Sequence, residues 1–324
     1  MNHDKGGYST RNEQPNGNRG NCHNGDVKAR GGATVPWGWA AAILGFTASI
    51  FLLFVFQNVL FMVGFFIIGL TNPFSLLKIQ WSFSLQKMTY EPSLTLGVTP
   101  ELLAFSTIGE LALIIIPVLY LKIKEIPLRE LGFKFKDRRT TMIDILIGAL
   151  AGIGMMWTAN VTSTLTTLTL QAILQLLYGP FYGIVSLLLA EEVISRINAP
   201  FSAANPAQLA ILLLSVTLLV APCEEVSTRG FLQQGLESSW GKWKGLLAAA
   251  LIFSLLHVIF YPQSASTIGY PNIGIISILL ALPSYIILSI TLGALLQIRE
   301  YRIITTIAAH ATYMTLLVIL LSSL

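Results

Sequence analysis

PAQLAILLLSVTLLVAPCEEVSTRG, residues 206–230, joins a long apolar run to two adjacent carboxylates and an arginine. The apolar part, 206–223, is close to the roughly 20 residues that a helix needs to cross a bilayer. Charged side chains are costly at such a place, so Glu224 and Glu225 require an explanation beyond membrane anchoring.

The composition of the whole chain is that of an integral membrane protein. Hydrophobic residues make up 54% of the 324 residues and charged residues only 11%, which is outside the usual range of soluble domains. We therefore predict an all-α fold, a polytopic bundle of transmembrane helices with seven or eight spans. Seven apolar stretches are clear and the eighth, 165–190, is less so; the seven are 37–70, 103–121, 141–160, 206–223, 244–261, 273–298 and 303–323.

The N-terminal region has a different composition. Residues 1–36 are rich in Gly, Asn and charged side chains, with too little apolar surface to fold, and are predicted to be a disordered polar tail. Residues 37–324 are predicted to form one transmembrane domain. Cys22 and Cys223 are too few for a disulfide framework or a four-thiolate metal site. The net charge of +4 is explained by membrane lipids, and no nucleic-acid partner is expected.

The basic residues give a prediction of topology. With the N-terminus in the cytoplasm and eight crossings, 13 of the 20 Lys and Arg residues would be cytoplasmic. If 165–190 is instead a re-entrant or surface-lying segment, 17 of the 20 would be, and the positive-inside rule favours this arrangement. Gly179, Pro180 and Gly183 provide a break in that segment. Glu224 and Glu225 would then lie at the cytoplasmic end of the fourth full span.

Two histidines stand out because they lie inside predicted spans. His257 and His310 are the only histidines outside the tail, which contains His3 and His23. A hydrogen-bonded core histidine is the simpler interpretation of one such residue. A pair together with Glu224 favours a functional site, since ionisable groups at membrane depth face the protein interior.

The two glutamates are predicted to have different roles. On a helix, Glu225 and Arg229 are four residues apart in the favourable order, so they can form an ion pair. Glu224 points about 100° away from Glu225 and is free to act elsewhere. A plain salt bridge at the membrane interface is the simpler alternative.

These residues resemble a known family. EEVSTRG, from Glu224, is similar to a Glu-Glu-x-x-x-Arg motif, and FSLLH, Phe253 to His257, to Phe-x-x-x-His. LGALLQIREYRIITTIAAH, ending at His310, looks like the last block of the type II CAAX prenyl protease and bacteriocin-processing (CPBP) family of intramembrane proteases. IPLRELGFKFKDRR is similar to the family's cytoplasmic loop, so the family core is expected over about 100–324.

A second copy of the acidic motif has no such partners. Glu191, Glu192 and Arg196 occur in EEVISR, which runs into INAPFSAANP rather than towards a histidine span. We interpret this copy as an interfacial charge cluster. Glu110, inside the second span, is left as an unassigned polar site.

The resemblance implies hydrolysis of a peptide bond in or near the membrane, by a water that Glu224 and His257 activate. His310 would stabilise the oxyanion. The predicted catalytic residues are thus Glu224, Glu225, His257 and His310, with Arg229 and Phe253 supporting the site. The residues also support this chemistry independently of the resemblance, because a carboxylate among apolar helices is a stronger base than one in water. No cofactor is expected. Zinc held by the two imidazoles and a carboxylate remains the alternative, although no His-Glu-x-x-His occurs.

One position departs from the family pattern. The family has Asn or Asp four residues after the last histidine, where this chain has Met314, whose thioether is not a hydrogen-bond donor. Tyr313 is the candidate to substitute. A weakly active or inactive pseudo-protease that serves as a membrane scaffold is therefore one alternative function, and a proton-coupled transporter is another. The expected partners are lipids and a membrane-associated peptide or protein, with or without a prenyl group, and the site is expected to open to the cytoplasm.

Overall fold

The computed structural model describes residues 33–71, 77–84, 89–96, 100–135, 137–202, 204–259 and 273–323. Most of the predicted tail, with His3, Cys22 and His23, lies outside these residues. Ala33, near the end of the predicted tail, is buried and so belongs to the folded part.

The body of the protein is an all-helical membrane bundle. Six helices in the described ranges are long and apolar enough to cross a membrane, and many large apolar side chains on them are exposed, as lipid-facing residues would be. The prediction of seven or eight spans is therefore too high for the described residues: α9, Lys242–Val258, has only 17 residues there, and 165–190 is not a span of its own. The six are Trp39–Thr71, Leu102–Ile123, Arg138–Tyr178, Pro206–Trp240, Ile273–Ile298 and Ile303–Ser322.

Several spans are composed of more than one helical segment. The first span is α1 (Trp39–Thr71), the second is α2 (Pro100–Ser106), the 3-10 helix η2 (Thr107–Leu111) and α3 (Ala112–Ile123), followed by the short η3 (Leu128–Leu131). The fourth is α6 (Pro206–Ser215), η4 (Val216–Val220), α7 (Ala221–Glu225), η5 (Val226–Gln233) and α8 (Gln234–Trp240). The remaining helices are α4 (Arg138–Tyr178), α5 (Pro180–Ser202), α11 (Ile273–Ile298) and α12 (Ile303–Ser322).

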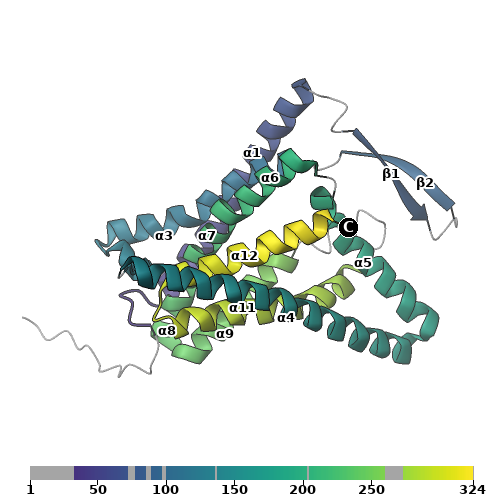
Figure 1. The fold of residues 1–324 in the computed structure, drawn as a ribbon. Helices are drawn as coiled ribbons and strands as arrows, with labels where there is room; N and C mark the ends of the chain where they lie inside the picture. Colours follow the sequence, from purple (N-terminus) through teal and green to yellow (C-terminus); the bar gives the residue numbers. More distant parts are fainter. Residues whose placement is uncertain are drawn as a thin grey trace, which may run out of the picture.

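The uncertain eighth stretch proves to be the tip of a helical hairpin. α4 continues through 165 to Tyr178, and α5 begins at Pro180. Gly179 between them has φ 87°, a conformation that favours glycine, and α5 packs against α4. With 41 residues, α4 is about 60 Å long at 1.5 Å per residue, and it runs along the whole bundle (Figure 1).

A β-hairpin is the exception to the all-α prediction. β1 (Leu77–Ser84) and β2 (Thr89–Leu96) pair antiparallel, with Leu77 opposite Leu96 and Ser84 opposite Thr89. The hairpin follows α1 and stands apart from the bundle (Figure 1). Its strands contain Lys78 and Glu91 and are shorter than a span, so hydropathy gives no signal for them.

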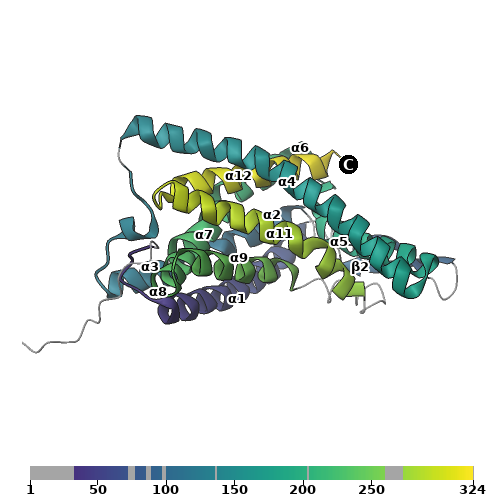
Figure 2. The same cartoon turned by 90° about the horizontal axis from the view of Figure 1, so that it is seen from below.

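The helices lie in layers that enclose α12. Figure 2 shows α4 on one side of the molecule and α1 on the other, with α12, α11 and α9 between them. α12 contacts both α4 and α7, and α11 contacts α9. The helix of His310 is therefore held between the helix of the two glutamates and α4.

Close packing of α4 on α12 depends on glycine. A Cβ atom on Gly152 would overlap the carbonyl oxygen of Ala309 and the side chain of Thr312, and one on Gly148 would overlap Thr305. Small residues allow two membrane helices to approach in this way. This contact fixes the position of α12 close to His310, which α12 carries.

We expect Gly152→Ala to destabilise the protein by about 1–3 kcal/mol, the usual cost of overpacking. Gly154→Ala is the matched control on the same helix, because nothing lies within 4 Å of a Cβ atom there, and it should change stability by less than about 0.5 kcal/mol. SDS-titration unfolding in mild detergent measures both. Equal stability of the two variants would contradict the tight α4–α12 contact.

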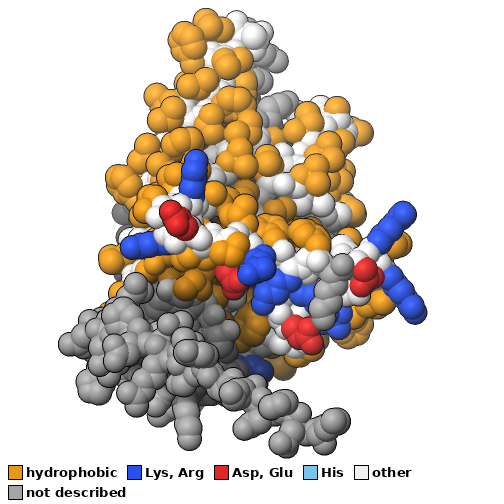
Figure 3. Space-filling model, turned by 90° about the vertical axis from the view of Figure 1, so that its left-hand side faces the viewer, with side chains coloured by type: hydrophobic (Ala, Val, Ile, Leu, Met, Phe, Trp, Pro, Cys, Tyr) orange, Lys and Arg blue, Asp and Glu red, His pale blue; other side chains and the backbone are white. Residues whose placement is uncertain are grey.

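Basic side chains gather at one end of the bundle. Figure 3 shows Lys and Arg groups on this end, together with some Asp and Glu groups, next to a largely apolar surface. Arg299 and Arg302, at the turn between α11 and α12, hold the buried carboxylate of Asp144 at 2.6 Å and 3.2 Å. The cluster joins the start of α4 to the turn between α11 and α12. It therefore fixes the N-terminal end of α12, and His310 lies eight residues after Arg302.

Candidate active site

The two glutamates lie on an irregular part of the fourth span. α7, which carries them, is flanked by two π-helical segments, η4 and η5. Pro222 has no N–H group to give to the helix ladder, which accounts for part of the irregularity. π-Helical turns within α-helices frequently occur at functional sites. The apolar pattern predicted that Glu224 lies at the end of the span. The span continues to Trp240, so Glu224 lies within it instead.

Glu225 is the buried, structural member of the pair. Its side chain is fully buried, and Oε1 lies 3.3 Å from Nη1 of Arg229 and 2.9 Å from Nδ1 of His310. The predicted ion pair between Glu225 and Arg229 is thus present. Glu225 also orients His310, which the sequence did not indicate.

Arg229 is fixed on all sides. Its Nη1 donates to Thr228 Oγ1 at 2.7 Å and its Nη2 to Ser289 Oγ at 2.9 Å. The guanidinium carbon lies 4.2 Å from the ring centroid of Phe253, a cation–π contact. Arg229 therefore joins the glutamate helix to α11 through Ser289 and to α9 through Phe253.

Glu224 faces both histidines. Its Oε2 is 3.9 Å from Nε2 of His257 and 3.7 Å from Nε2 of His310. These separations are too long for direct hydrogen bonds, and Oε2 has no hydrogen-bond partner among the described residues. Three polar atoms from three helices, α7, α9 and α12, therefore converge on one point.

The hydrogen bonds of the histidines define their proton positions. Nδ1 of His257 is 2.9 Å from the carbonyl oxygen of Phe253, which can only accept, so Nδ1 carries the proton. In the neutral ring, Nε2 then presents a lone pair towards Glu224. His310 is oriented in the same way, since its Nδ1 faces the Glu225 carboxylate.

A cavity of about 170 Å³ opens beside these atoms. Glu224, His257 and His310 line its polar part, and the remaining lining is largely apolar, from α4, α11 and α12. Tyr313 and Met314 also line it, as expected for residues one turn after His310. A site of this kind, apolar with a few convergent polar groups, is suited to a ligand with an apolar part.

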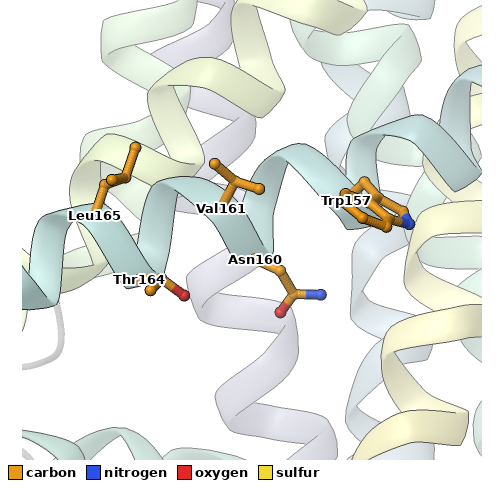
Figure 4. Close-up of a pocket in the computed structure, with 5 residues that line it drawn as sticks. All are labelled: Trp157, Asn160, Val161, Thr164 and Leu165. Atoms are coloured by element: carbon orange, nitrogen blue, oxygen red, sulfur yellow. The ribbon is translucent and has the colours of Figure 1, made fainter.

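Two further hollows among the described residues contain none of the site residues. One of them, of about 360 Å³ on α4, is lined by Trp157, Asn160, Val161, Thr164 and Leu165. These side chains all come from one helix (Figure 4), and all five are exposed. It has no titratable side chain and so cannot supply a base.

The acidic residues outside the site are placed as follows. Glu191 and Glu192 are exposed on α5 and do not line the cavity. Glu110 is buried, accepts a hydrogen bond of 2.7 Å from Gln57 Nε2, and interacts electrostatically with Glu224. It lies outside the cavity lining, and its partner is a glutamine of α1 rather than an arginine.

A second buried network fixes the turn before α12. Glu237 accepts hydrogen bonds of 2.7 Å from Gln233, Gln297 and Tyr301. Burial, together with the hydrogen bond to Glu237, raises the pKa of Tyr301 far above its usual range, so the phenol remains a donor. Tyr301 has φ 61°, a strained conformation for a non-glycine residue, and this hydrogen bond holds it there.

Two residues at the site were missed from the sequence. Tyr285 lines the cavity with its ring centroid 4.9 Å from that of His257, and Ser289 binds Arg229. Both are on α11, four residues apart and thus on one face. Polar residues at that spacing within an apolar span were the available signal.

No three His, Cys, Asp or Glu side chains in the described ranges are grouped as the ligands of a metal ion. Glu224, His257 and His310 are the residues that would hold zinc in the alternative mechanism.

Residues 206–316 match a family model described as Type II CAAX prenyl endopeptidase Rce1-like. No curated protein and no solved structure matches the chain. The matched residues include Glu224, Glu225, Arg229, His257 and His310, and they lie within the family core predicted over about 100–324. This chain therefore carries, over residues 206–316, a domain of the Rce1-like type II CAAX prenyl endopeptidase family.

Proposed function

We propose that the chain is an intramembrane endopeptidase that hydrolyses a peptide bond with a water activated by Glu224. The observation that carries the proposal is the position of Glu224 Oε2, 3.7 Å and 3.9 Å from Nε2 of two histidines at the polar part of the cavity. Membership of an enzyme family supports it, because the motif residues of that family are the ones that converge.

The distances leave room for a shared water. An oxygen about 2.8 Å from both Glu224 Oε2 and His257 Nε2, an ordinary hydrogen-bond length, fits on the cavity side of the two atoms. Glu224 would take one proton from this water as its oxygen attacks the carbonyl carbon. His257 would accept the second hydrogen bond and hold the water in line.

The opposite histidine would stabilise the oxyanion. Nδ1 of His310 donates to Glu225, so Nε2 can also donate only when the ring carries both protons. His310 lies between two carboxylates, with Nε2 3.7 Å from Glu224 Oε2 and Nδ1 2.9 Å from Glu225 Oε1, so both ring nitrogens face acceptors. The C–N bond breaks as Glu224 returns its proton to the leaving nitrogen, and Glu224 is then ready for the next cycle.

The substrate class follows from the cavity. Its lining beyond the polar atoms consists mostly of Leu, Val and Met side chains, so the bound peptide needs an apolar side chain, a lipid anchor or a prenyl group. We propose a membrane-associated peptide or protein as the substrate, with the basic end of the bundle facing the cytoplasm by the positive-inside rule. The N-terminus and the opening of the site would then be cytoplasmic.

A mixed library of lipidated and unlipidated peptides tests the proposal. The purified protein in lipid nanodiscs should cleave a subset at a fixed bond, and mass spectrometry identifies the products. A parallel reaction with a chelator should proceed at the same rate, and loss of hydrolysis there would favour the zinc mechanism. Complete absence of products would contradict the protease and favour the scaffold.

One observation keeps the scaffold under consideration. Met314 lines the cavity at the position where the family has Asn or Asp. If the wild type is inactive for this reason, Met314→Asn should produce hydrolysis where none was detected. Equal inactivity of the two proteins would rule out this explanation.

A further inference from the structure

The cavity offers few hydrogen-bond donors for an oxyanion. Of the thirteen described residues that line it, four have side chains with N–H or O–H groups: His257, Tyr285, His310 and Tyr313. In the proposed reaction His257 holds the water, so His310 supplies one donor and the tyrosines are the source of any second. Two donors are the usual arrangement for an oxyanion, and each contributes about 10²–10³ in rate.

The two tyrosines differ in their surroundings. Tyr313 packs with the apolar cluster of Met155, Leu288 and Leu292, which places its ring between α4 and α11. The ring of Tyr285 lies against His257 instead, with centroids 4.9 Å apart and an interplanar angle of 36°. Tyr285 is therefore the tyrosine next to the reacting atoms.

The helix of Tyr285 is held firmly at this level. Ser289 is one turn further along the same face of α11 and accepts a hydrogen bond of 2.9 Å from the buried Arg229. Arg229 is in turn paired with Glu225, the residue that orients His310. Tyr285 and His310 are thus positioned by the same arginine–glutamate pair, from two different helices.

We propose that Tyr285 is a catalytic residue, whose hydroxyl donates a hydrogen bond to the carbonyl oxygen of the scissile peptide bond alongside His310. The inference rests on the proposed function and assigns a second oxyanion donor to α11. The phenol keeps its proton throughout, so the step adds no change to the balance of the hydrolysis. It also explains how the site can work with Met314 in place of a donor.

Tyr285→Phe is the test, since it removes the hydroxyl and keeps the ring against His257. With a peptide cleaved by the wild type, we expect kcat to fall about 100-fold and KM to change by less than about threefold. Tyr182→Phe is the matched control, because the ring of Tyr182 contacts that of Tyr178 at the α4–α5 hairpin and does not line the cavity. It should leave both constants unchanged.

A tetrahedral phosphinate analogue of the same peptide gives a second readout. Its affinity should fall with Tyr285→Phe in proportion to kcat, whereas the affinity for the uncleaved peptide should not. When Met314→Asn is added to the Tyr285→Phe protein, kcat should recover at least a tenth of the difference between the wild type and the Tyr285→Phe variant. Both effects depend on a donor at the oxyanion and would not result from a structural defect.

The inference and the proposed function can fail separately. If hydrolysis depends on Glu224 but Tyr285→Phe leaves kcat and analogue affinity intact, the role of Tyr285 is wrong and the protease stands. If Tyr285→Phe weakens peptide and analogue binding equally, the residue is structural and the inference is again overturned. If no variant or wild type cleaves any peptide, the proposed function itself fails.

Discussion

Replacing Glu224 with Gln is expected to lower kcat about 10³-fold, within the range for loss of a general base. The carboxamide keeps the size of the side chain, and hence the cavity, but cannot take a proton from water. Stopped assays with the peptide identified from the library, analysed by mass spectrometry, give kcat. KM should change little, because Glu224 acts on the water rather than on the peptide.

The second acidic motif provides the control for this experiment. Glu191→Gln makes the same chemical change on α5, at an exposed side chain outside the cavity, and should leave kcat unchanged. A Glu224→Gln protein with more than a tenth of the wild-type kcat would exclude the glutamate as the base. Loss of activity in the Glu191 variant would mean that the interpretation of EEVISR as a charge cluster is wrong.

The sequence was sufficient to predict the membrane class and the family. Both follow from local features: apolar runs of bilayer length are visible without knowledge of contacts, and residues 206–316 match the family whose motifs run from Glu224 to His310. The pairing of Glu225 with Arg229 was likewise predictable, because helical spacing alone brings the two side chains together.

The depth of the site could not be predicted in the same way. A count of residues from the nearest basic side chains, at 1.5 Å of helical rise each, gives Glu224, His257 and His310 depths that differ by up to about 10 Å. In the structure Glu224 lies within 4 Å of both imidazoles, since its span continues fifteen residues past Glu225 to Trp240. Glu224 and Glu225 end the apolar run of the sequence, but the helical span continues beyond them.

The remaining differences come from tertiary contacts. The sequence pattern of α4 changes at 160 because its far half packs on α5, so one helix of 41 residues was interpreted as two segments. The contribution of α11 to the site was missed for a similar reason. Tyr285 and Ser289 occur in a span that carries no charge, and only the packing of α11 against α9 and η5 brings them to His257 and Arg229.

Replacing Arg229 with Met is expected to reduce the free energy of unfolding by about 3–5 kcal/mol, the cost of leaving one member of a buried ion pair without its partner. The side chains of Arg229 and Glu225 are only 2% and 0% exposed. Methionine fills part of the space against Phe253, so the loss reports mainly the uncompensated carboxylate of Glu225. SDS-titration unfolding in mild detergent measures the change.

Two further variants identify the cause. Adding Glu225→Gln to the Arg229→Met protein removes both charges and should recover much of the stability, as replacement of whole buried pairs does in other proteins. Arg129→Met is the surface control, because Arg129 is 73% exposed in its contact with Glu130 and such pairs contribute about 1 kcal/mol or less. The stabilised double variant should still hydrolyse peptide slowly, since the carboxylate that orients His310 through Nδ1 is no longer present. Full activity in that protein would show that the arginine–glutamate pair supports the fold and has no part in positioning the imidazole.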